Sequence, residues 1–225
     1  MIKNLKTKVS KYYQNQNDKL SFSVPSETIF RLLGNYKFNY LNKNCLDIGI
    51  GSGDNLLEFK RRKANIFGID IRKNIINKFV NTHRLNKKNF FICDLNKSFP
   101  DINKMDLILM KDILYYIELE RQFEIFKIIY QKLKKNGLFL FQYIQKELKL
   151  RNKNFFQYNI LKNYSKLKNY HEEKNPISFL EDRHITKLIK SQKFQIINSI
   201  FDINTHCKDN TLVVINRFIL LKKKN

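Results

Sequence analysis

The most constraining feature of this sequence is a cluster of three glycines, Gly49, Gly51 and Gly53, that follows the apolar segment at residues 45–48. The 225-residue chain has only six glycines, so half of them lie within these five positions. Glycine adopts positive φ angles and lets the backbone approach a ligand without a Cβ atom in the way. An apolar strand, a glycine turn and a helix in succession therefore predict an α/β unit with a ligand-binding loop.

The glycine spacing excludes two common nucleotide loops. The dinucleotide pattern G-x-G-x-x-G would need a glycine at position 54, where the chain has Asp54. The phosphate-binding pattern G-x-x-x-x-G-K-[ST] is also missing, because no Gly-Lys pair occurs in the sequence. Asp47 before the turn and Asp54 after it would repel a pyrophosphate. They favour a cationic or amine-bearing ligand, and a tight turn that binds no cofactor is the alternative.

Two further apolar segments also end in an aspartate. Residues 65–69 lead into Asp70, and residues 89–93 lead into Asp94. In nucleoside-binding α/β folds, a carboxylate roughly 20 residues beyond the glycine turn accepts hydrogen bonds from the ribose hydroxyls. Asp70 fits this role by its position. A solvated acid at the end of a strand is a common alternative for each aspartate alone, but three successive strands that end this way indicate a shared site.

These residues resemble the first motifs of the class I S-adenosylmethionine-dependent methyltransferases, in which an apolar strand is followed by (Asp/Glu)-x-Gly-x-Gly-x-Gly. The resemblance implies that Asp47 or backbone carbonyl groups of the glycine loop hold the ammonium group of the cofactor. It implies that Asp70, followed by Ile71, binds the ribose. It also implies that Asp94 contacts the adenine amino group while Leu95 packs on the ring.

A fourth apolar segment, residues 106–111, resembles the family's region that faces the methionine end of the cofactor and the acceptor. Met110 and Lys111 are therefore expected in the cofactor site, and Asp112 and Tyr116 are candidate catalytic residues. His184 is a third candidate, because it begins a helix after the insert and a hydroxyl acceptor would need a general base. Packing against the following helix is the alternative for the tyrosine, and simple exposure is the alternative for the histidine.

The alternation of strand and helix patterns predicts an α/β fold. We expect a doubly wound, mostly parallel seven-stranded sheet with an antiparallel last strand and helices on both faces. The expected helices are residues 54–62, 73–85, 119–134 and 181–191, the third being stopped by Gly137 after two lysines and an asparagine. The later strands are expected at residues 137–143, 194–201 and 211–221.

The length predicts a single domain over residues 1–225. Residues 1–40 are expected to form an N-terminal helical lid, with a capped amphipathic helix at 26–33 and with Tyr13 (or Tyr12) covering the cofactor. Residues 41–144 form the cofactor-binding half, and residues 145–179 form a substrate-side insert. Residues 180–225 are expected to supply a helix and a pair of strands.

A formal net charge of +23 favours polyanionic partners. However, lysine supplies 34 of the 43 basic residues and there is one alanine, which is the composition of an A/T-rich genome. The basic residues are scattered along the chain. The sequence has no Pro-Pro pair of the kind found in adenine N-methyltransferases, and residues 211–221 contain no glutamate of the kind that ribose 2′-O enzymes use. A nucleic-acid substrate is therefore not the favoured hypothesis.

The cysteines and the apolar runs set limits on covalent cross-links, metal centres and location. Three cysteines predict neither a disulfide framework nor a metal centre, and Cys45 and Cys93 are expected inside strands. No apolar run reaches the length of a membrane span, so the expected location is the cytoplasm. No pattern indicates an oligomeric state.

The sequence thus predicts an enzyme that transfers a methyl group from S-adenosylmethionine to an oxygen or nitrogen atom of a small molecule. An RNA methyltransferase acting on tRNA or rRNA is the second hypothesis. The third is a methyltransferase-like interaction protein without catalysis, which would have no need to keep the glycines and the acids.

Overall fold

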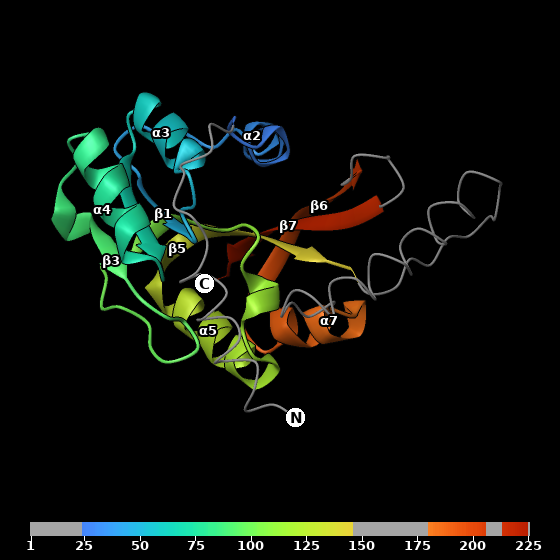
Figure 1. Ribbon diagram of the computed structural model, residues 1–225. Helices are drawn as coiled ribbons and strands as arrows, with labels where there is room; N and C mark the ends of the chain where they lie inside the picture. The colour runs from blue at the N-terminus through green and yellow to red at the C-terminus, as the bar shows by residue number, and fades with distance from the viewer. Residues whose placement is uncertain (1–23, 146–179, 206–212, 225) are drawn as a thin grey trace.

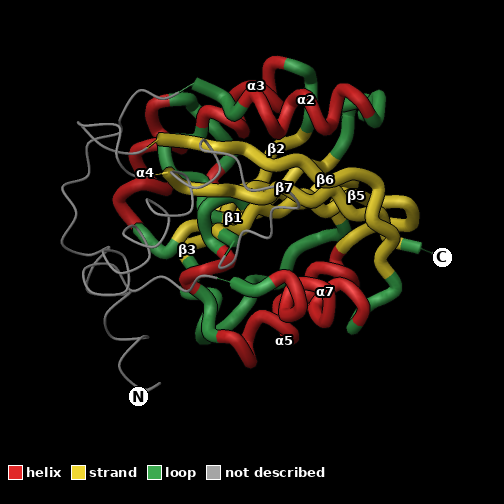
Figure 2. The backbone as a smooth tube through the Cα atoms, turned by 90° about the vertical axis from the view of Figure 1, so that its right-hand side faces the viewer, coloured by secondary structure: helices red, strands yellow, loops and turns green. Residues whose placement is uncertain are grey.

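The computed structural model describes residues 24–145, 180–205 and 213–224. These residues form one seven-stranded sheet with helices packed on both of its faces (Figures 1 and 2). The elements in chain order are α2 (Glu27–Asn35), β1 (Asn44–Ile48), α3 (Asp54–Arg61), β2 (Asn65–Asp70), α4 (Lys73–Thr82), the 3₁₀ turn η1 (Lys87–Asn89), β3 (Phe90–Ile92), β4 (Met105–Met110), the 3₁₀ turn η2 (Leu114–Tyr116), α5 (Leu119–Lys132), β5 (Leu133–Ile144), α7 (Asp182–Lys190), β6 (Phe194–Thr205) and β7 (Val213–Lys223).

The strand order in the sheet is β3-β2-β1-β4-β5-β7-β6. Strands β1 to β5 pair in parallel, and β7 is antiparallel to both of its neighbours, β5 and β6. The predicted fold class is therefore confirmed, including the antiparallel last strand. The chain leaves β1 toward β2 on one side and later returns to place β4 on the other, so the strand order reverses between β1 and β4. Ligands of open α/β sheets bind at this switch point.

The two faces of the sheet have separate apolar cores. Helices α2, α3 and α4 cover one face, where Phe59 and Phe79 are fully buried, while α5 and α7 cover the other (Figure 2). On the second face, the Phe126 ring of α5 meets the rings of Phe139 and Phe141 edge-on, each with 5.3 Å between ring centres. Because both faces are covered, the central strands are apolar almost throughout, as is typical of parallel sheets.

The strand register brings the predicted site residues to one edge. Ile48 at the end of β1 pairs with Ile69 of β2 and with Met110 of β4. The residues that follow these three positions therefore emerge side by side at the carboxyl edge of the sheet. Asp70 at the end of β2 pairs with Ile92 of β3, which places Asp94 two residues beyond the same edge.

The largest difference from the predicted elements lies between α5 and β5. The helix ends at Lys132, and Leu133 is already extended and paired with Met105 of β4. The register then shifts, because Leu107 pairs with Leu138, so the intervening lysines form a bulge. Gly137 therefore does not stop the helix as predicted. Asn136 is the residue with positive φ, at 61°.

Smaller corrections concern the ends of other elements. Strand β3 is only three residues long, so Cys93, Asp94 and Leu95 lie in the loop that follows it. Ser26 occupies the N-cap position of α2 but its side chain makes no capping hydrogen bond, and its backbone N–H instead donates to Asn55 Oδ1 at 3.0 Å. The predicted insert at 145–179 lies, except for Gln145, outside the described residues, as does most of the N-terminal segment, including Tyr13.

Candidate functional site

A cavity of about 340 Å³ lies at the carboxyl edge of the sheet, above the switch point between β1 and β4. Its size falls within the usual range for small-molecule sites, about 300–1,000 Å³. Strands β1 and β2 and the loops after β1, β3 and β4 all contribute to its walls. The residues that line it are Val24, Ser26, Asp47, Ile48, Gly49, Ile50, Gly51, Ser52, Asp54, Asn55, Ile69, Asp70, Ile71, Arg72, Cys93, Asp94, Leu95, Asn96, Lys111, Asp112, Ile113, Tyr116 and Ile117.

The three glycines of the loop after β1 all have positive φ, at 80°, 51° and 84° in chain order. Gly49 and Gly53 are also required by packing, because a Cβ atom would lie 2.1 Å from Ile113 Cδ1 in the first case and 2.0 Å from the Phe79 ring in the second. At Gly51 a Cβ atom would meet nothing within 4 Å. The loop thus needs Gly51 for its backbone conformation, and that backbone is open to the cavity.

Asp47 is almost completely buried at the end of β1, with 2% of its surface exposed. Among the described residues, its carboxylate has no hydrogen-bond or ion-pair partner. Burial raises the pKa of Asp47 well above its usual range. The charge of Lys111 opposes this shift, and the charges of Asp70 and Asp112 add to it. A cationic group bound in the cavity would stabilise the ionised form of Asp47.

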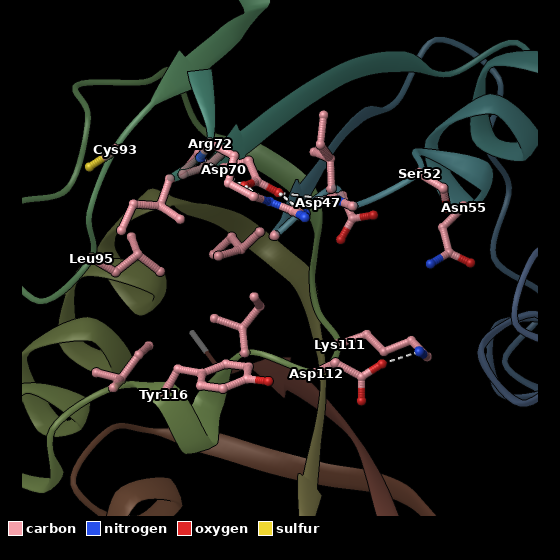
Figure 3. A pocket seen from close by; sticks show the side chains of 18 of the residues that line it. Asp47, Ser52, Asn55, Asp70, Arg72, Cys93, Leu95, Lys111, Asp112 and Tyr116 are labelled. Atoms are coloured by element: carbon pink, nitrogen blue, oxygen red, sulfur yellow. Dashed lines mark hydrogen bonds and ion pairs between the residues drawn. The ribbon is translucent and has the colours of Figure 1, made fainter. Parts of the chain in front are cut away.

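Asp70 is held rigidly at the end of β2. Its Oδ2 accepts a hydrogen bond from the backbone N–H of Gly51 at 3.2 Å, which ties the glycine loop to β2. Its Oδ1 accepts from both the backbone N–H and the Nε of Arg72, at 3.0 and 3.1 Å, and Arg72 Nη2 donates to Oδ2 at 3.4 Å (Figure 3). The carboxylate is thus oriented by four hydrogen bonds from Gly51 and Arg72, and Asp70 lines the cavity.

The loop after β3 closes the side of the cavity nearest Asp94 and Leu95. Asp94 Oδ1 accepts from the backbone N–H of Asn96 at 3.0 Å. The Asn96 side chain then bridges to the segment after β4, because its Nδ2 donates to Tyr116 O at 3.1 Å and its Oδ1 accepts from Glu118 N at 3.0 Å. Asn96 thereby links the wall formed by the β3 loop to the wall formed by η2.

Lys111 and Asp112 follow β4 on the opposite side of the cavity from Asp70 (Figure 3). Their side chains form an ion pair with each other. Asp112 has a φ of 58°, which is unfavourable for a residue with a side chain. Its Oδ1 accepts from Tyr115 OH at 3.1 Å, and its carboxylate remains half-exposed. Tyr116, whose ring is 4.6 Å from that of Tyr115 between centres, lines the cavity beside it.

The structure does not bring His184 to the cavity. Its Nε2 lies 2.8 Å from Gln122 Oε1, and its ring packs edge-on against Phe123 between α5 and α7. Gln122 Nε2 donates to the carbonyl oxygens of Leu114 and Ile117 at 3.1 and 2.9 Å, so its Oε1 is left to accept a hydrogen bond from His184. His184 therefore stabilises η2 through its hydrogen bond with Gln122. Burial lowers the pKa of its imidazole, with Lys187 adding to the effect.

Eight of the eleven residues predicted to bind the cofactor line the cavity: Asp47, Gly49, Gly51, Asp70, Ile71, Asp94, Leu95 and Lys111. Met110 is fully buried beneath the cavity and Gly53 packs against Phe79, so neither contributes to its lining. Tyr13 lies outside the described residues. Of the three candidate catalytic residues, Asp112 and Tyr116 line the cavity.

Sequence reasoning missed several lining residues, of which Ser26, Ser52, Asn55, Arg72 and Asn96 carry polar side chains. Arg72 and Asn96 stand two residues after Asp70 and Asp94, so their proximity to the strand ends was the available signal. Asn55 gave no signal, because it is one of many asparagines. Cys93 was expected inside a strand, but it lines the cavity and its Sγ is 3.4 Å from both Ser98 O and Ser98 Oγ.

The cavity is acidic although the chain is strongly basic. Five of its lining residues are aspartates and two are cationic, namely Arg72 and Lys111. In a region of low dielectric constant, this excess of carboxylates favours a ligand that carries positive charge. The described residues contain no cluster of three or more histidine, cysteine, aspartate or glutamate side chains that could hold a metal ion. No helix within the described ranges is long and apolar enough to span a membrane.

Comparison with known proteins identifies the family. A protein-family profile described as "Methyltransferase domain" matches residues 24–208, which is most of the chain. The chain belongs to the class I S-adenosylmethionine-dependent methyltransferase family. The match includes every strand end that contributes to the cavity, so the predicted family is confirmed. No curated protein sequence matches this chain significantly.

Solved structures of methyltransferases share the fold at low sequence identity. Magnesium protoporphyrin IX methyltransferase from Synechocystis PCC 6803, with bound S-adenosylmethionine, superposes with a TM-score of 0.67 at 12% identity and covers 98% of this chain and 97% of its own. A methyltransferase from Methanosarcina mazei superposes with a TM-score of 0.61 at 17% identity, over 86% and 97% of the two chains. The N-methyltransferase NodS from Bradyrhizobium japonicum, with S-adenosylhomocysteine, gives 0.63 at 12% identity over 99% and 98%.

Proposed function

We propose that this methyltransferase binds S-adenosylmethionine in the cavity above β1 and β4 and transfers its methyl group to an oxygen or nitrogen atom of a small molecule. The observation that supports this most strongly is the convergence of the glycine loop, Asp70 and Asp94 on one acidic cavity. The cofactor carries a sulfonium and an ammonium group against one carboxylate. Its net positive charge therefore matches the excess of aspartates around it.

Each part of the cofactor has a suitable partner in the cavity. The ribose hydroxyls would donate to Asp70, whose carboxylate is already oriented by Gly51 and Arg72. The adenine would lie near Asp94 and Leu95, where Leu95 provides a buried apolar contact. The ammonium group would lie near the glycine loop, close to the unpartnered Asp47. This assignment leaves Asp112 and Tyr116 at the other side, where the acceptor would bind.

The chemistry requires mainly orientation. The acceptor atom attacks the methyl carbon in line with the bond to sulfur, and the sulfur leaves as a neutral thioether. Holding the two reactants at about 3–3.5 Å in this geometry removes most of the entropic barrier. Asp112 is the residue best placed to orient the acceptor or to accept its proton, since its carboxylate is half-exposed at the cavity. Tyr116 would contact the acceptor from η2.

The acceptor is proposed to be a small molecule by comparison with the structural neighbours. The structural neighbour from Synechocystis is named for a porphyrin acceptor, and NodS is named as an N-methyltransferase. A further neighbour, from Haemonchus contortus, is named as a phosphoethanolamine N-methyltransferase. An RNA acceptor is the second candidate, favoured only by the net charge of +23.

The proposed location is the cytoplasm, because three cysteines without a disulfide framework suit a reducing compartment.

We also propose that residues 1–40 and 145–179, most of which lie outside the described residues, shape the acceptor side. Residues 1–40 would serve as a lid and residues 145–179 as a substrate-side insert, since they precede β1 and follow β5, the two strands beside β4 in the sheet. Incubating the protein with methyl-labelled S-adenosylmethionine and a cell extract tests the proposed acceptor class. We expect label in a low-mass fraction that resists RNase. Label that disappears after RNase treatment would establish the RNA alternative, and no transfer at all would contradict the proposed function.

A further inference from the structure

The backbone of Asp112 is held by a side chain from a different strand. The N–H of Asp112 donates to Gln142 Oε1 at 2.8 Å. Gln142 lies on β5 directly after Phe141, which pairs with Met110 at the end of β4. Its side chain therefore reaches across from the neighbouring strand to the loop that begins where β4 ends (β4 and β5 lie side by side in the sheet order).

Gln142 is an unusual residue for its position in the sheet. It is fully buried, and the preceding residues on the same face of β5, Leu138 and Leu140, belong to the apolar core. Burying an amide without hydrogen bonds is unfavourable, so an apolar residue would be expected here on packing grounds alone. The amide is satisfied only because it bonds to Asp112 on one side and to another buried polar residue on the other.

That second residue is Asn216 of β7. Gln142 Nε2 donates to Asn216 Oδ1, and Asn216 is 7% exposed. Since β5 and β7 are adjacent, with Ile144 paired to Asn216, the contact crosses directly between the two strands. A continuous polar chain thus runs from β7 through β5 to the backbone of Asp112, inside an otherwise apolar layer. The orientation of Gln142 is fixed at both ends.

The conformation that this chain stabilises is an unfavourable one. Asp112 has a φ of 58°, a strained conformation for a residue with a side chain, which persists only where the surrounding structure imposes it. The Gln142 hydrogen bond holds the backbone, while Tyr115 OH holds the Asp112 carboxylate at 3.1 Å. Backbone and side chain are thereby fixed independently. Asp112 lines the cavity, and its half-exposed carboxylate also pairs with Lys111 (Figure 3).

We infer that Gln142 and Asn216 are positioning residues that set the location of the Asp112 carboxylate at the acceptor end of the cavity. The inference rests on the proposed function, because that function places the acceptor beside Asp112. Neither residue lines the cavity, so both act through Asp112 and not on the acceptor itself. Since a displacement of about 1 Å in a reacting geometry can slow a reaction about 100-fold, such an anchor affects the rate of transfer and not the binding of the cofactor.

Three substitutions test this inference. Gln142→Met keeps the length of the side chain but removes the oxygen that accepts the hydrogen bond from Asp112 N–H. Asn216→Leu leaves this oxygen in place but removes the hydrogen bond that orients the Gln142 side chain. Gln142→Glu is the conservative variant, because a buried glutamic acid stays protonated and can accept from Asp112 while donating to Asn216. Ile144→Val is the matched control, since it trims the residue paired with Asn216 without touching the polar chain.

The first measurement is hydrogen exchange of the Asp112 amide by nuclear magnetic resonance. One net hydrogen bond is worth about 1 kcal/mol, and more when a buried partner is left unsatisfied, so we expect exchange to accelerate about tenfold in Gln142→Met. A smaller acceleration is expected in Asn216→Leu, and near-normal protection in Gln142→Glu and Ile144→Val. Equal exchange in the wild type and Gln142→Met would overturn the inference. Should Gln142→Met not fold, Asn216→Leu against Ile144→Val decides the same question.

The second measurement separates positioning from general destabilisation. Transfer from methyl-labelled S-adenosylmethionine to cell extract should fall at least about tenfold in Gln142→Met and recover in Gln142→Glu. The affinity for S-adenosylhomocysteine, measured by calorimetry, should change less than about twofold, because cofactor contacts are untouched. A parallel loss of affinity and transfer would show a merely structural role. If the wild type itself transfers no label, the proposed function fails, whereas the exchange measurement still decides whether Gln142 holds Asp112.

Discussion

The two ends of the cavity are built in different ways. At the cofactor end, the contacts join residues that are close in sequence. The Asp70 carboxylate accepts hydrogen bonds from Arg72, two residues away, and from Gly51 in the preceding strand–loop unit. At the acceptor end, Asp112 depends on Gln142, 30 residues away, which in turn depends on Asn216, a further 74 residues along the chain. The cofactor end is thus a local construction that recurs with its motif, while the acceptor end is assembled by the whole sheet.

This comparison predicts that substitutions at the cofactor end abolish cofactor binding. Asp70→Ala would remove the proposed acceptor of the two ribose hydroxyl hydrogen bonds, each worth about 1.5–3 kcal/mol when one partner is charged. We expect calorimetry to show at least about 100-fold weaker binding of S-adenosylmethionine. Asp101→Ala is the control, because Asp101 is a fully exposed aspartate outside the cavity, and it should bind normally. Unchanged binding by Asp70→Ala would break the assignment of the cofactor end.

Substitutions at Gly49 and Gly51 test separately how packing and backbone strain contribute to the stability of the cofactor end. Gly49→Ala places a methyl group 2.1 Å from Ile113, so overpacking of about 1–3 kcal/mol adds to the strain of positive φ. Gly51→Ala has open space and incurs only the strain, about 1–2 kcal/mol. Urea denaturation should therefore show a larger loss of stability for Gly49→Ala. Equal losses would mean that packing against the loop after β4 does not constrain Gly49.

Replacing Asp47 is expected to stabilise the folded protein but to weaken its binding of the cofactor. Its pKa is raised by burial, so the free protein is more stable when Asp47 is protonated and loses that advantage as the pH rises through the raised pKa. Asp47→Asn should therefore be more stable than the wild type at neutral pH. It should nevertheless bind S-adenosylmethionine more weakly, because the partner of the ammonium group has lost its charge.

The same residue predicts how binding depends on pH. A cationic ligand favours ionised Asp47, so the affinity of the wild type should increase with pH above the ordinary aspartate pKa of 3.8 until the raised pKa is passed. Asp47→Asn should lack this dependence in calorimetric titrations over the same range. A wild-type affinity that falls with pH, or a slope that persists in Asp47→Asn, would contradict the assignment.

The smallest effect is expected at His184, which supports η2 without reaching the cavity. His184→Gln should change the affinity for S-adenosylhomocysteine less than about twofold, while lowering the thermal midpoint slightly. Because burial lowers the pKa of His184, its contribution to stability is fully present above the ordinary histidine pKa of 6.5 and is lost as the pH falls from there through the lowered pKa. A large loss of methyl transfer in this variant, with its affinity and fold intact, would restore His184 as a catalytic candidate.

The contrast between the two ends explains what the sequence could predict. The glycine loop, Asp70 and Asp94 were found because parallel strands end at one edge, so residues that follow apolar segments converge there. Gln142 was not found, because nothing in a run of apolar residues shows that one amide reaches the next strand's loop. His184 was misplaced, since its position at the start of α7 does not reveal which side of the sheet the helix covers.

The boundaries of elements failed for a related reason. Lysines, an asparagine and a glycine after α5 have the composition of a helix terminus, but the register between β4 and β5 draws Leu133 into the sheet and makes these residues a bulge. Tertiary pairing overrode the local pattern there. The fold class survived such errors because it depends on the succession of elements and not on where each one ends.

The central claim is that the three strand ends form one adenosyl-cofactor site, and a crystal structure of the complex with S-adenosylhomocysteine tests it most directly. We expect the ribose hydroxyls within hydrogen-bond distance of the Asp70 carboxylate, the adenine beside Asp94 and Leu95, and the sulfur turned toward Asp112. Ligand density elsewhere on the protein, or an empty cavity at saturating ligand, would contradict the claim.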